Sequence, residues 1–188
     1  SKFRNAFTIA AFGSICRRFY WCTSTRGLHL RRASSMSIVD YLDTNQVLIS
    51  VPSRSKKQVI EELTERVATL TGLSQRCLLD MVMRRERLGS TGIGTGIAIP
   101  HAVHDNLTRT IALLAVLKTP IDFDAIDGQP IDIICLVVGP PNDDTNNLKC
   151  IASVTRSLQQ ASTWDKLRSV KSPEAVLRCL QAFGSVAA

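Results

Sequence analysis

Two unbroken apolar runs, residues 111–117 and 133–138, constrain the fold of this chain most strongly. Each has the length of a β-strand, and neither alternates between apolar and polar residues, so we expect both strands to be buried on two faces. Both runs are far shorter than the ~20 residues that a membrane-spanning helix needs. We therefore expect a sheet with a hydrophobic core on each side and no insertion into a membrane.

Amphipathic segments flank these runs. Ser55 and Gln58 form a possible capping box, and apolar residues at helical spacing follow as far as Gly72, namely Val59, Ile60, Leu63, Val67 and Leu70. The spacing predicts further helices over residues 75–87 and 146–160 and a last helix from Pro173 to about residue 183.

Short strands are predicted at residues 47–51 and 97–99, in addition to the two buried runs. A short helical turn is expected at residues 37–42. Strands and helices interleave along the chain, which is typical of the α/β class. We predict a mixed β-sheet of about five strands with helices on both faces.

The first 35 residues differ in composition from the rest. Seven of the chain's 23 lysine and arginine residues lie there and no acidic residue does, which leaves 16 basic and 16 acidic residues in the remainder. This composition resembles an organellar transit peptide; the alternative is upstream sequence that is not part of the functional protein. We interpret residues 1–35 as an extension outside the fold and residues 36–188 as the folded domain. Without its extension the chain has no basic stripe, so we expect no nucleic-acid binding.

The six cysteines form no C-x-x-C pair, and most of them lie in apolar segments. A free cysteine in such a segment behaves as a small hydrophobic residue. This use of cysteine fits a reducing compartment better than a disulfide framework. We expect a cytoplasmic protein.

The segment with the most chemical information is residues 89–101, GSTGIGTGIAIPH. Glycine lets a backbone approach an anion closely and direct N–H groups at it. Pro100 then ends a short strand and places His101 beside this loop. A neutral imidazole can act as a nucleophile toward a phosphoryl group, with a nearby arginine holding the oxygens. We expect the loop groups to assist: Ser90, Thr91, Gly92 and Gly94.

Other interpretations of these residues are weaker. A P-loop needs lysine where Thr95 stands, and the glycines do not have the spacing of a dinucleotide fingerprint. A lone histidine is often purely structural. His101 and His104 would share a metal on a helix, but Pro100 argues against a helix there, and we expect His104 at the surface. The acids between residues 122 and 127 are expected to be solvated and not to bind a cation.

Residues 89–101, with Arg85 and Glu86 before them, closely resemble the signature of the enzyme IIA proteins of the phosphoenolpyruvate-dependent phosphotransferase system. The likeness is to the fructose/mannitol class, and best to its nitrogen-regulatory branch. Residues 123–130, FDAIDGQP, resemble a second signature of that class. The likeness runs without interruption from about residue 36 to residue 183.

The resemblance assigns roles to individual residues. The histidine after Ile-Pro is the phosphoacceptor of this family, which implies that His101 takes the phosphoryl group, and the arginine of the Arg-Glu pair implies Arg85 as its neighbour. At the position of the family's second, supporting histidine this chain has Asn147, which carries no charge. Two smaller departures are Thr95, where asparagine is common, and Ala102, where glycine is common.

The resemblance implies a phosphohistidine carrier that receives its phosphoryl group from an HPr-type phosphocarrier and acts in nitrogen-related regulation. Transfer between two imidazoles needs in-line placement and stabilised oxygens, so we expect no metal and no other cofactor. Downstream, we expect regulatory protein targets or a transporter subunit. Two alternatives stay open: a relay to a fructose- or mannitol-type sugar transporter, and a binding module that is never phosphorylated, which the presence of Asn147 motivates.

Overall fold

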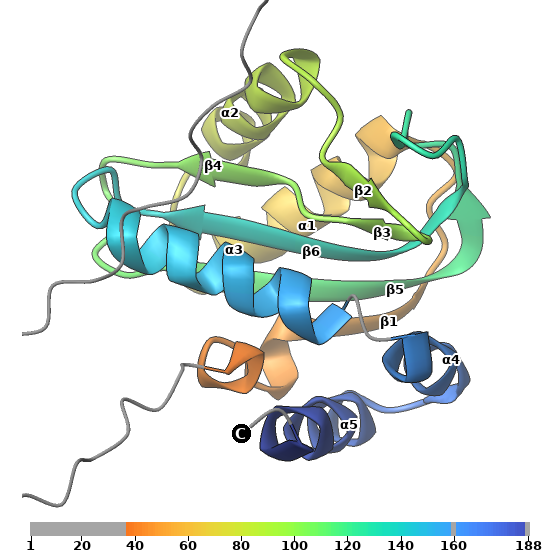
Figure 1. The fold of residues 1–188 in the computed structure, drawn as a ribbon. Coiled ribbons are helices and arrows are strands. Elements are labelled where there is room, and N and C mark those ends of the chain that lie inside the picture. The colour runs from red at the N-terminus through yellow and green to blue at the C-terminus, as the bar shows by residue number, and fades with distance from the viewer. Residues whose placement is uncertain (1–36, 159–160, 187–188) are drawn as a thin grey trace, which may run out of the picture. The chain divides into compact units, whose positions relative to one another are not determined.

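A computed structural model describes residues 37–158 and 161–186. The predicted basic extension, residues 1–35, lies outside the described residues. Within the described part, a mixed sheet carries helices on both faces, as Figure 1 shows, and the predicted fold class is confirmed.

The two apolar runs form the middle of the sheet. Strand β5 (Ile111–Ile121) pairs antiparallel with β6 (Ile131–Gly139), with Leu113 opposite Leu136. Successive residues of a strand point to opposite faces, and Leu113 and Leu114 accordingly belong to two separate hydrophobic clusters. The continuous apolar pattern therefore reports burial on both sides, as predicted.

Shorter strands complete the sheet on both sides of this pair. The described residues form six strands in the order β1-β5-β6-β3-β2, with β4 also paired to β6. Strand β1 is parallel to β5, β3 and β4 are parallel to β6, and β2 is antiparallel to β3. Their bounds are β1 (Val47–Val51), β2 (Gly92–Gly94), β3 (Ile97–Ala98) and β4 (His101–Val103).

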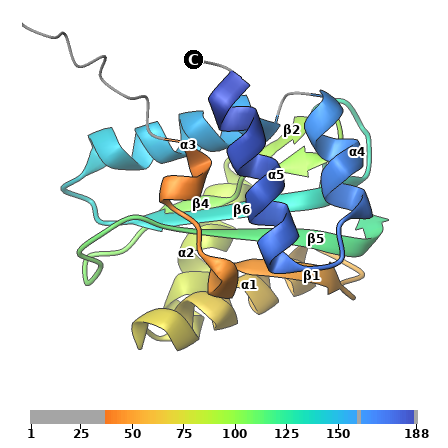
Figure 2. The same ribbon diagram turned by 90° about the horizontal axis from the view of Figure 1, so that it is seen from below.

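Helices cover the two faces of the sheet (Figures 1 and 2). On one face lie α1 (Lys56–Thr71) and α2 (Gln75–Arg87), which pack on residues such as Leu113. The opposite face is covered by α3 (Asp144–Leu158), α4 (Ala161–Ser169), α5 (Pro173–Val186) and two short 3₁₀ turns, η1 (Ile38–Asp40) and η2 (Thr44–Gln46).

Local signals placed α1 and α2 correctly. The Ser55 hydroxyl accepts a hydrogen bond from the Gln58 N–H at 3.2 Å, and Gly72 ends α1 with φ +73°. The predicted capping box is only half formed, because the Gln58 side chain accepts from Arg54 N–H instead. Leu70, the last apolar residue at this spacing, lies in α1 as expected but is 41% exposed, and the buried residues of the helix end at Val67.

Two short strands, one helix and the turn η2 were not predicted. Strands β2 and β4 have three residues each, too few to show a period of two, and β2 lies in the stretch expected to be a loop. Helix α4 was also missed. Of these, β4 matters most for function because it begins at His101.

Candidate functional site

The glycine-rich stretch folds as a β-hairpin. Strands β2 and β3 are joined by Thr95 and Gly96, with φ +59° and +84°. Two-residue hairpin loops of this mirror-image kind need positive φ at both positions, and asparagine followed by glycine is preferred there. A β-branched threonine is strained in that conformation. The common asparagine of the family thus has a conformational explanation.

The imidazole of His101 is held by one partner on each nitrogen. Its Nδ1 lies 3.0 Å from the carbonyl oxygen of Ile99, and its Nε2 lies 3.1 Å from Nε of Arg85. A guanidinium only donates hydrogen bonds, so Nε2 must be the acceptor and Nδ1 must carry the proton. The two contacts select one neutral tautomer, and its lone pair is on Nε2.

Arg85 reaches the ring from the last turn of α2. Its NH1 group also donates to the carbonyl oxygen of Gly89 at 3.0 Å, which ties the guanidinium to the turn after the helix. These two bonds use two of the five N–H groups of an arginine. Among the described residues, no acceptor is paired with the other three. They remain available to oxygens of a group bound at Nε2.

The strand register defines the face on which His101 lies. His101 is paired with Val137 of β6, and the next residue, Ala102, is paired with Val138. Val137 belongs to the cluster under α3, whereas Ala102 packs against the cluster under α1 and α2. Since side chains alternate along a strand, His101 faces the α3 side, and Arg85 reaches its ring from the end of α2.

A buried carboxylate lies directly beside Arg85. Glu86 is 5% exposed and accepts hydrogen bonds from Thr91 N–H at 2.9 Å and from Thr91 Oγ1 at 2.6 Å. It also pairs with Lys56 Nζ at 3.0 Å. In the sequence this residue stands out only as part of a signature. Leu78, Val82 and Glu86 follow one another at intervals of four residues, and this spacing was the signal that α2 buries a charge.

The predicted loop residues have their polar groups engaged within the protein. Ser90 Oγ donates to the carbonyl oxygen of Phe123 at 2.8 Å and accepts from Gly92 N–H at 3.2 Å. Thr91 is bound to Glu86 as described above. A Cβ atom on Gly94 would lie 3.0 Å from Asp127 Oδ2, and the same carboxylate accepts from Thr95 N–H at 2.8 Å.

The hairpin therefore packs against the loop of the second signature. A Cβ atom on Gly92 would lie 2.8 Å from Cβ of Ala125, closer than real Cβ contacts. At this position glycine permits close approach of two segments. The structure brings Arg85 to His101, and it shows Ser90, Thr91 and the two glycines in contacts within and around the hairpin.

Asn147 occupies the first turn of α3 and is 8% exposed. Its Oδ1 accepts a hydrogen bond from Thr110 Oγ1 at 2.7 Å, and its Nδ2 donates to the carbonyl oxygen of Pro140 at 2.8 Å. A Cβ atom on Gly139 would overlap Asn147 Oδ1. The amide of Asn147 thus packs against the end of β6 and is bonded to the residue after it. Within the described residues it makes no hydrogen bond to His101.

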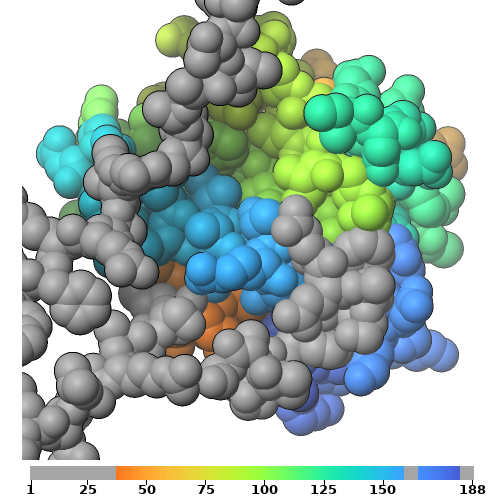
Figure 3. Space-filling model, viewed as in Figure 1, coloured from red at the N-terminus to blue at the C-terminus, as the bar shows by residue number. Residues whose placement is uncertain are grey.

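Exposed apolar side chains border this site. Val103, two residues after His101 on β4, is 47% exposed, and Leu148, next to Asn147, is 65% exposed. Leu88, at the end of α2 and three residues after Arg85, is 83% exposed. In Figure 3 the outer surface of α3, drawn in light blue, is open at the centre of this face.

A family model described as "Phosphoenolpyruvate-dependent sugar phosphotransferase system, EIIA 2" matches residues 40–182. The chain belongs to this enzyme IIA family. A "Nitrogen regulatory protein" of Bradyrhizobium diazoefficiens is 35% identical over 145 residues, which cover 77% of this chain and 95% of that protein. One of Klebsiella oxytoca is 32% identical over 153 residues, covering 81% and 94%.

Among solved structures, the nitrogen regulatory protein IIA-Ntr from Neisseria meningitidis superposes with a TM-score of 0.72 at 29% identity. The match covers 76% of this chain and 98% of that one. The two signatures therefore predicted the family correctly, and the predicted similarity to nitrogen regulatory proteins is confirmed as well. The roles of individual site residues in this enzyme IIA domain stay predictions.

Two further features of the enzyme IIA domain bear on metals and membranes. His104 is 7% exposed, so the prediction of a surface position was wrong: the turn after β4 buries it, and its Nδ1 accepts from Asn106 N–H. Across residues 37–158 and 161–186, no three His, Cys, Asp or Glu side chains gather as a metal site. In the same ranges no helix is long and apolar enough to cross a membrane.

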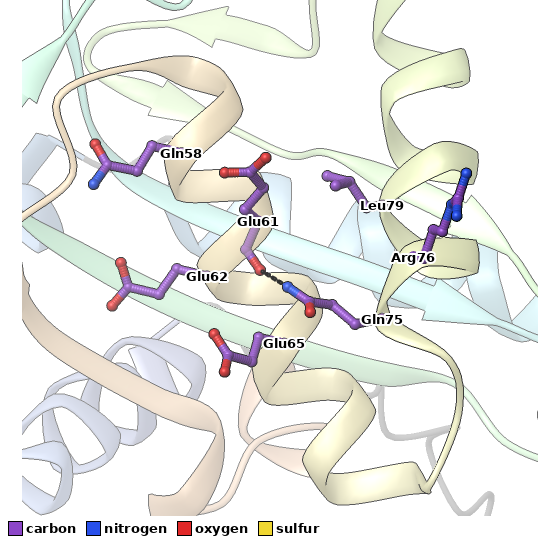
Figure 4. A pocket seen from close by; sticks show the side chains of 7 residues that line it. All are labelled: Gln58, Glu61, Glu62, Glu65, Gln75, Arg76 and Leu79. Atoms are coloured by element: carbon purple, nitrogen blue, oxygen red, sulfur yellow. Dashed lines mark hydrogen bonds between the residues drawn. The ribbon is translucent and has the colours of Figure 1, made fainter.

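A groove of about 620 Å³ lies between α1 and α2, as Figure 4 shows. Three glutamates, Glu61, Glu62 and Glu65, line it, and Gln75 Nε2 donates to the backbone carbonyl of Glu61 at 3.3 Å across it. An acidic lining repels a phosphoryl group, and none of the predicted site residues belongs to this groove. The chemistry of His101 is thus not located in this groove.

Proposed function

We propose that this enzyme IIA domain, residues 36–188, is a phosphohistidine carrier that takes a phosphoryl group from an HPr-type phosphocarrier onto Nε2 of His101. One observation carries the proposal: Ile99 and Arg85 hold the ring as the neutral tautomer with its lone pair on Nε2. A neutral ring nitrogen is the nucleophilic form of histidine.

The transfer step follows from this geometry. The Nε2 lone pair of His101 forms a P–N bond as the P–N bond to the donor histidine breaks, and the electron pair of that bond returns to the donor ring. The proton stays on Nδ1, where the Ile99 carbonyl stabilises the charge of the phosphorylated ring. Arg85 must release Nε2 as the new bond forms, and its N–H groups then donate to the phosphoryl oxygens.

The surroundings of His101 support a protein as the phosphoryl donor. Two histidines can exchange a phosphoryl group only if the two proteins meet closely at both rings. The exposed apolar side chains of Leu88, Val103 and Leu148 offer the contact area that such a docking needs. All four cysteines of the described residues are free thiols, which suits a cytoplasmic location.

We further propose that the phosphorylation state of His101 serves nitrogen-related regulation, which the similarity to nitrogen regulatory proteins supports. The alternative, relay to a fructose- or mannitol-type transporter, differs only downstream of His101. A pull-down with phosphorylated and unphosphorylated protein separates the two. Regulators that bind one state support regulation, and recovery of a transporter subunit alone contradicts it.

The carrier function is tested by intact-mass analysis after incubation with phosphoenolpyruvate, enzyme I and HPr. We expect one acid-labile phosphoryl group on the native protein and on the control His104→Gln, and none on His101→Gln. His104 is the matched control because it is the neighbouring histidine and lies outside the proposed reaction. A folded native protein that stays unphosphorylated with its cognate donor contradicts the proposal, as does phosphorylation of the His101 variant.

A further inference from the structure

Glu86 is a buried acid that the proposed reaction does not use. Its carboxylate receives both hydrogen-bond donors of Thr91, the backbone N–H and the hydroxyl, at 2.9 and 2.6 Å. Lys56, from the start of α1, supplies the balancing charge at 3.0 Å. A buried carboxylate is costly unless it is paired and hydrogen-bonded, and here three donors meet that requirement.

The contacts of Glu86 continue to the ring of His101. The carbonyl oxygen of Thr91 accepts from Ile99 N–H at 3.0 Å, and the carbonyl oxygen of Ile99 faces Nδ1 of His101 at 3.0 Å. Three hydrogen bonds, joined through the backbones of Thr91 and Ile99, therefore connect the carboxylate to one nitrogen of the imidazole. Thr91 is thus bonded directly to the residue whose carbonyl selects the tautomer.

Glu86 also follows directly in the chain on Arg85, which is the partner of the other ring nitrogen, Nε2. Arg85, the preceding residue, donates from Nε to Nε2 of His101 at 3.1 Å. Glu86 therefore joins the end of α2, which carries Arg85, to Thr91 at the start of the hairpin, and Thr91 in turn is bonded to Ile99 just after it. The distance between the Arg85 guanidinium and the Ile99 carbonyl, which contact the two ring nitrogens, depends on this junction.

Lys56 connects the junction to the second family signature. Its Nζ donates to the carbonyl oxygen of Phe123 at 3.0 Å, pairs with Asp124 at 3.1 Å and lies 4.8 Å from the centre of the Phe123 ring. Burial lowers the pKa of Lys56, but its bonds to Glu86 and Asp124 outweigh that and raise the pKa overall. Lys56 therefore remains charged opposite Glu86.

We propose that Glu86 is a positioning residue for phosphoryl acceptance: by fixing Thr91 against the end of α2, it holds Ile99 and Arg85 at the separation that keeps His101 in its Nδ1-protonated form. The proposal rests on the proposed function for its kinetic consequence. The tautomer of the resting protein, however, does not depend on any phosphoryl transfer. Glu86 itself touches neither the ring nor the incoming group.

Glu86→Gln tests the proposal because it keeps the shape and removes the charge. The NH2 group of the glutamine amide can only donate hydrogen bonds, so it would lie against the donors of Lys56 or Thr91. Asp124→Asn is the matched control, since Asp124 shares Lys56 but is exposed and has no bond to Thr91. Both variants are examined by urea unfolding, by the rate of phosphorylation from phospho-HPr, and by ¹⁵N NMR of the imidazoles.

We expect Glu86→Gln to lower the phosphorylation rate by about 10- to 100-fold, the scale of a misplaced reacting group, and to lower the share of the Nδ1-protonated tautomer. Asp124→Asn should change the rate by less than about twofold and leave the ring spectrum unchanged. A folded Glu86→Gln protein with the native rate and the native tautomer overturns the proposal. Equal effects of the two variants overturn it as well.

A second variant covers the case in which Glu86→Gln does not fold. Thr91→Val removes the hydroxyl bond to Glu86 and keeps the N–H bond, so a smaller shift in the same tautomer is expected. An unchanged His101 spectrum in that variant contradicts the proposal. If native protein accepts no phosphoryl group, the proposed function fails, whereas the NMR comparison still decides whether Glu86 positions the ring.

Discussion

The α2 side and the α3 side of His101 differ in what their polar groups are bound to. On the α2 side, Arg85 contacts the ring directly and keeps further N–H groups for a ligand. On the α3 side lies Asn147, the residue predicted from the resemblance to take the place of a second histidine, and its amide is bound to Thr110 and to the Pro140 carbonyl. The α2 side thus carries a cation with N–H groups that are not yet paired, and the α3 side carries a neutral amide bonded to two neighbouring residues.

The two side chains therefore differ in how far their polar groups are already bound within the fold. A group that is to receive phosphoryl oxygens must have donors that water or ligand can reach. Arg85 keeps three such N–H groups, whereas Asn147 is buried and binds Thr110 through Oδ1 and the Pro140 carbonyl through one of its two N–H groups. We infer that the site works from one side, with Arg85 supplying the charge and Asn147 supplying rigidity.

Removing Arg85 should produce the largest effect on transfer. We expect Arg85→Met to lower the phosphorylation rate by about 100-fold or more, the cost of losing one preorganised donor to a developing charge. Stability should change by less than about 1 kcal/mol, because both bonds of Arg85 lie near the surface. The rate is measured by intact mass at timed intervals, with unfolding in urea as the companion measurement.

Arg87→Met is the control for Arg85, since Arg87 is an exposed arginine at the same helix end. It should keep the native rate within about twofold. If both variants lose activity equally, the effect belongs to the overall positive charge and not to the contact with His101.

Truncating Asn147 should produce the opposite pattern. Asn147→Ala leaves Thr110 Oγ1 and the Pro140 carbonyl without their buried partner, and we expect a loss of about 2 kcal/mol in the free energy of unfolding. The phosphorylation rate of the folded fraction should fall by less than about threefold. Urea titration and timed mass analysis on the same sample measure both quantities.

Asn142→Ala controls for the loss of an asparagine, because Asn142 is exposed in the loop before α3. The urea concentration at the midpoint of its unfolding should equal that of the native protein. A large loss of rate in Asn147→Ala without a loss of stability would show that the α3 side takes part in the transfer, and the one-sided account would be wrong.

The smallest effect is expected in the hairpin itself. Thr95→Asn should raise the free energy of unfolding by about 0.5–1 kcal/mol, because asparagine tolerates the positive φ that strains threonine. The same change at Thr119, an exposed residue of β5 with ordinary φ, should be neutral or slightly unfavourable. The midpoints of thermal unfolding check the two signs, and equal shifts would refute the conformational explanation.

Much of the fold was accessible from local pattern. The bounds of α2 and β1 were predicted correctly, because capping residues and apolar spacing are properties of neighbouring residues. The glycine hairpin was not predicted, and the exposure of Leu70 was not evident from its helical spacing. Apolar spacing along a helix does not indicate which of its residues the rest of the protein covers. A three-residue strand is too short to show a pattern and is recognised only by its pairing with another strand.

The site shows the same division. His101 and Arg85 were found from a signature and its chemistry, and the structure places them in contact. Ser90 and Thr91 were predicted to assist the phosphoryl group, which stays a prediction, and in the structure their hydroxyls are bound to Phe123 and Glu86. Composition shows that donors are present in a loop, but it cannot show which acceptors lie within reach.

The sequence by itself determined that the chain forms a mixed α/β sheet with two cores, that it resembles the enzyme IIA family, and that His101 is the candidate acceptor. Only the tertiary structure decided the tautomer of that histidine, the burial of Glu86 and the commitment of Asn147. The physical reason is sequence separation. Periodicity and capping act over a few residues, whereas the hydrogen bonds that select a tautomer or hold an amide join residues 16 and 37 positions apart.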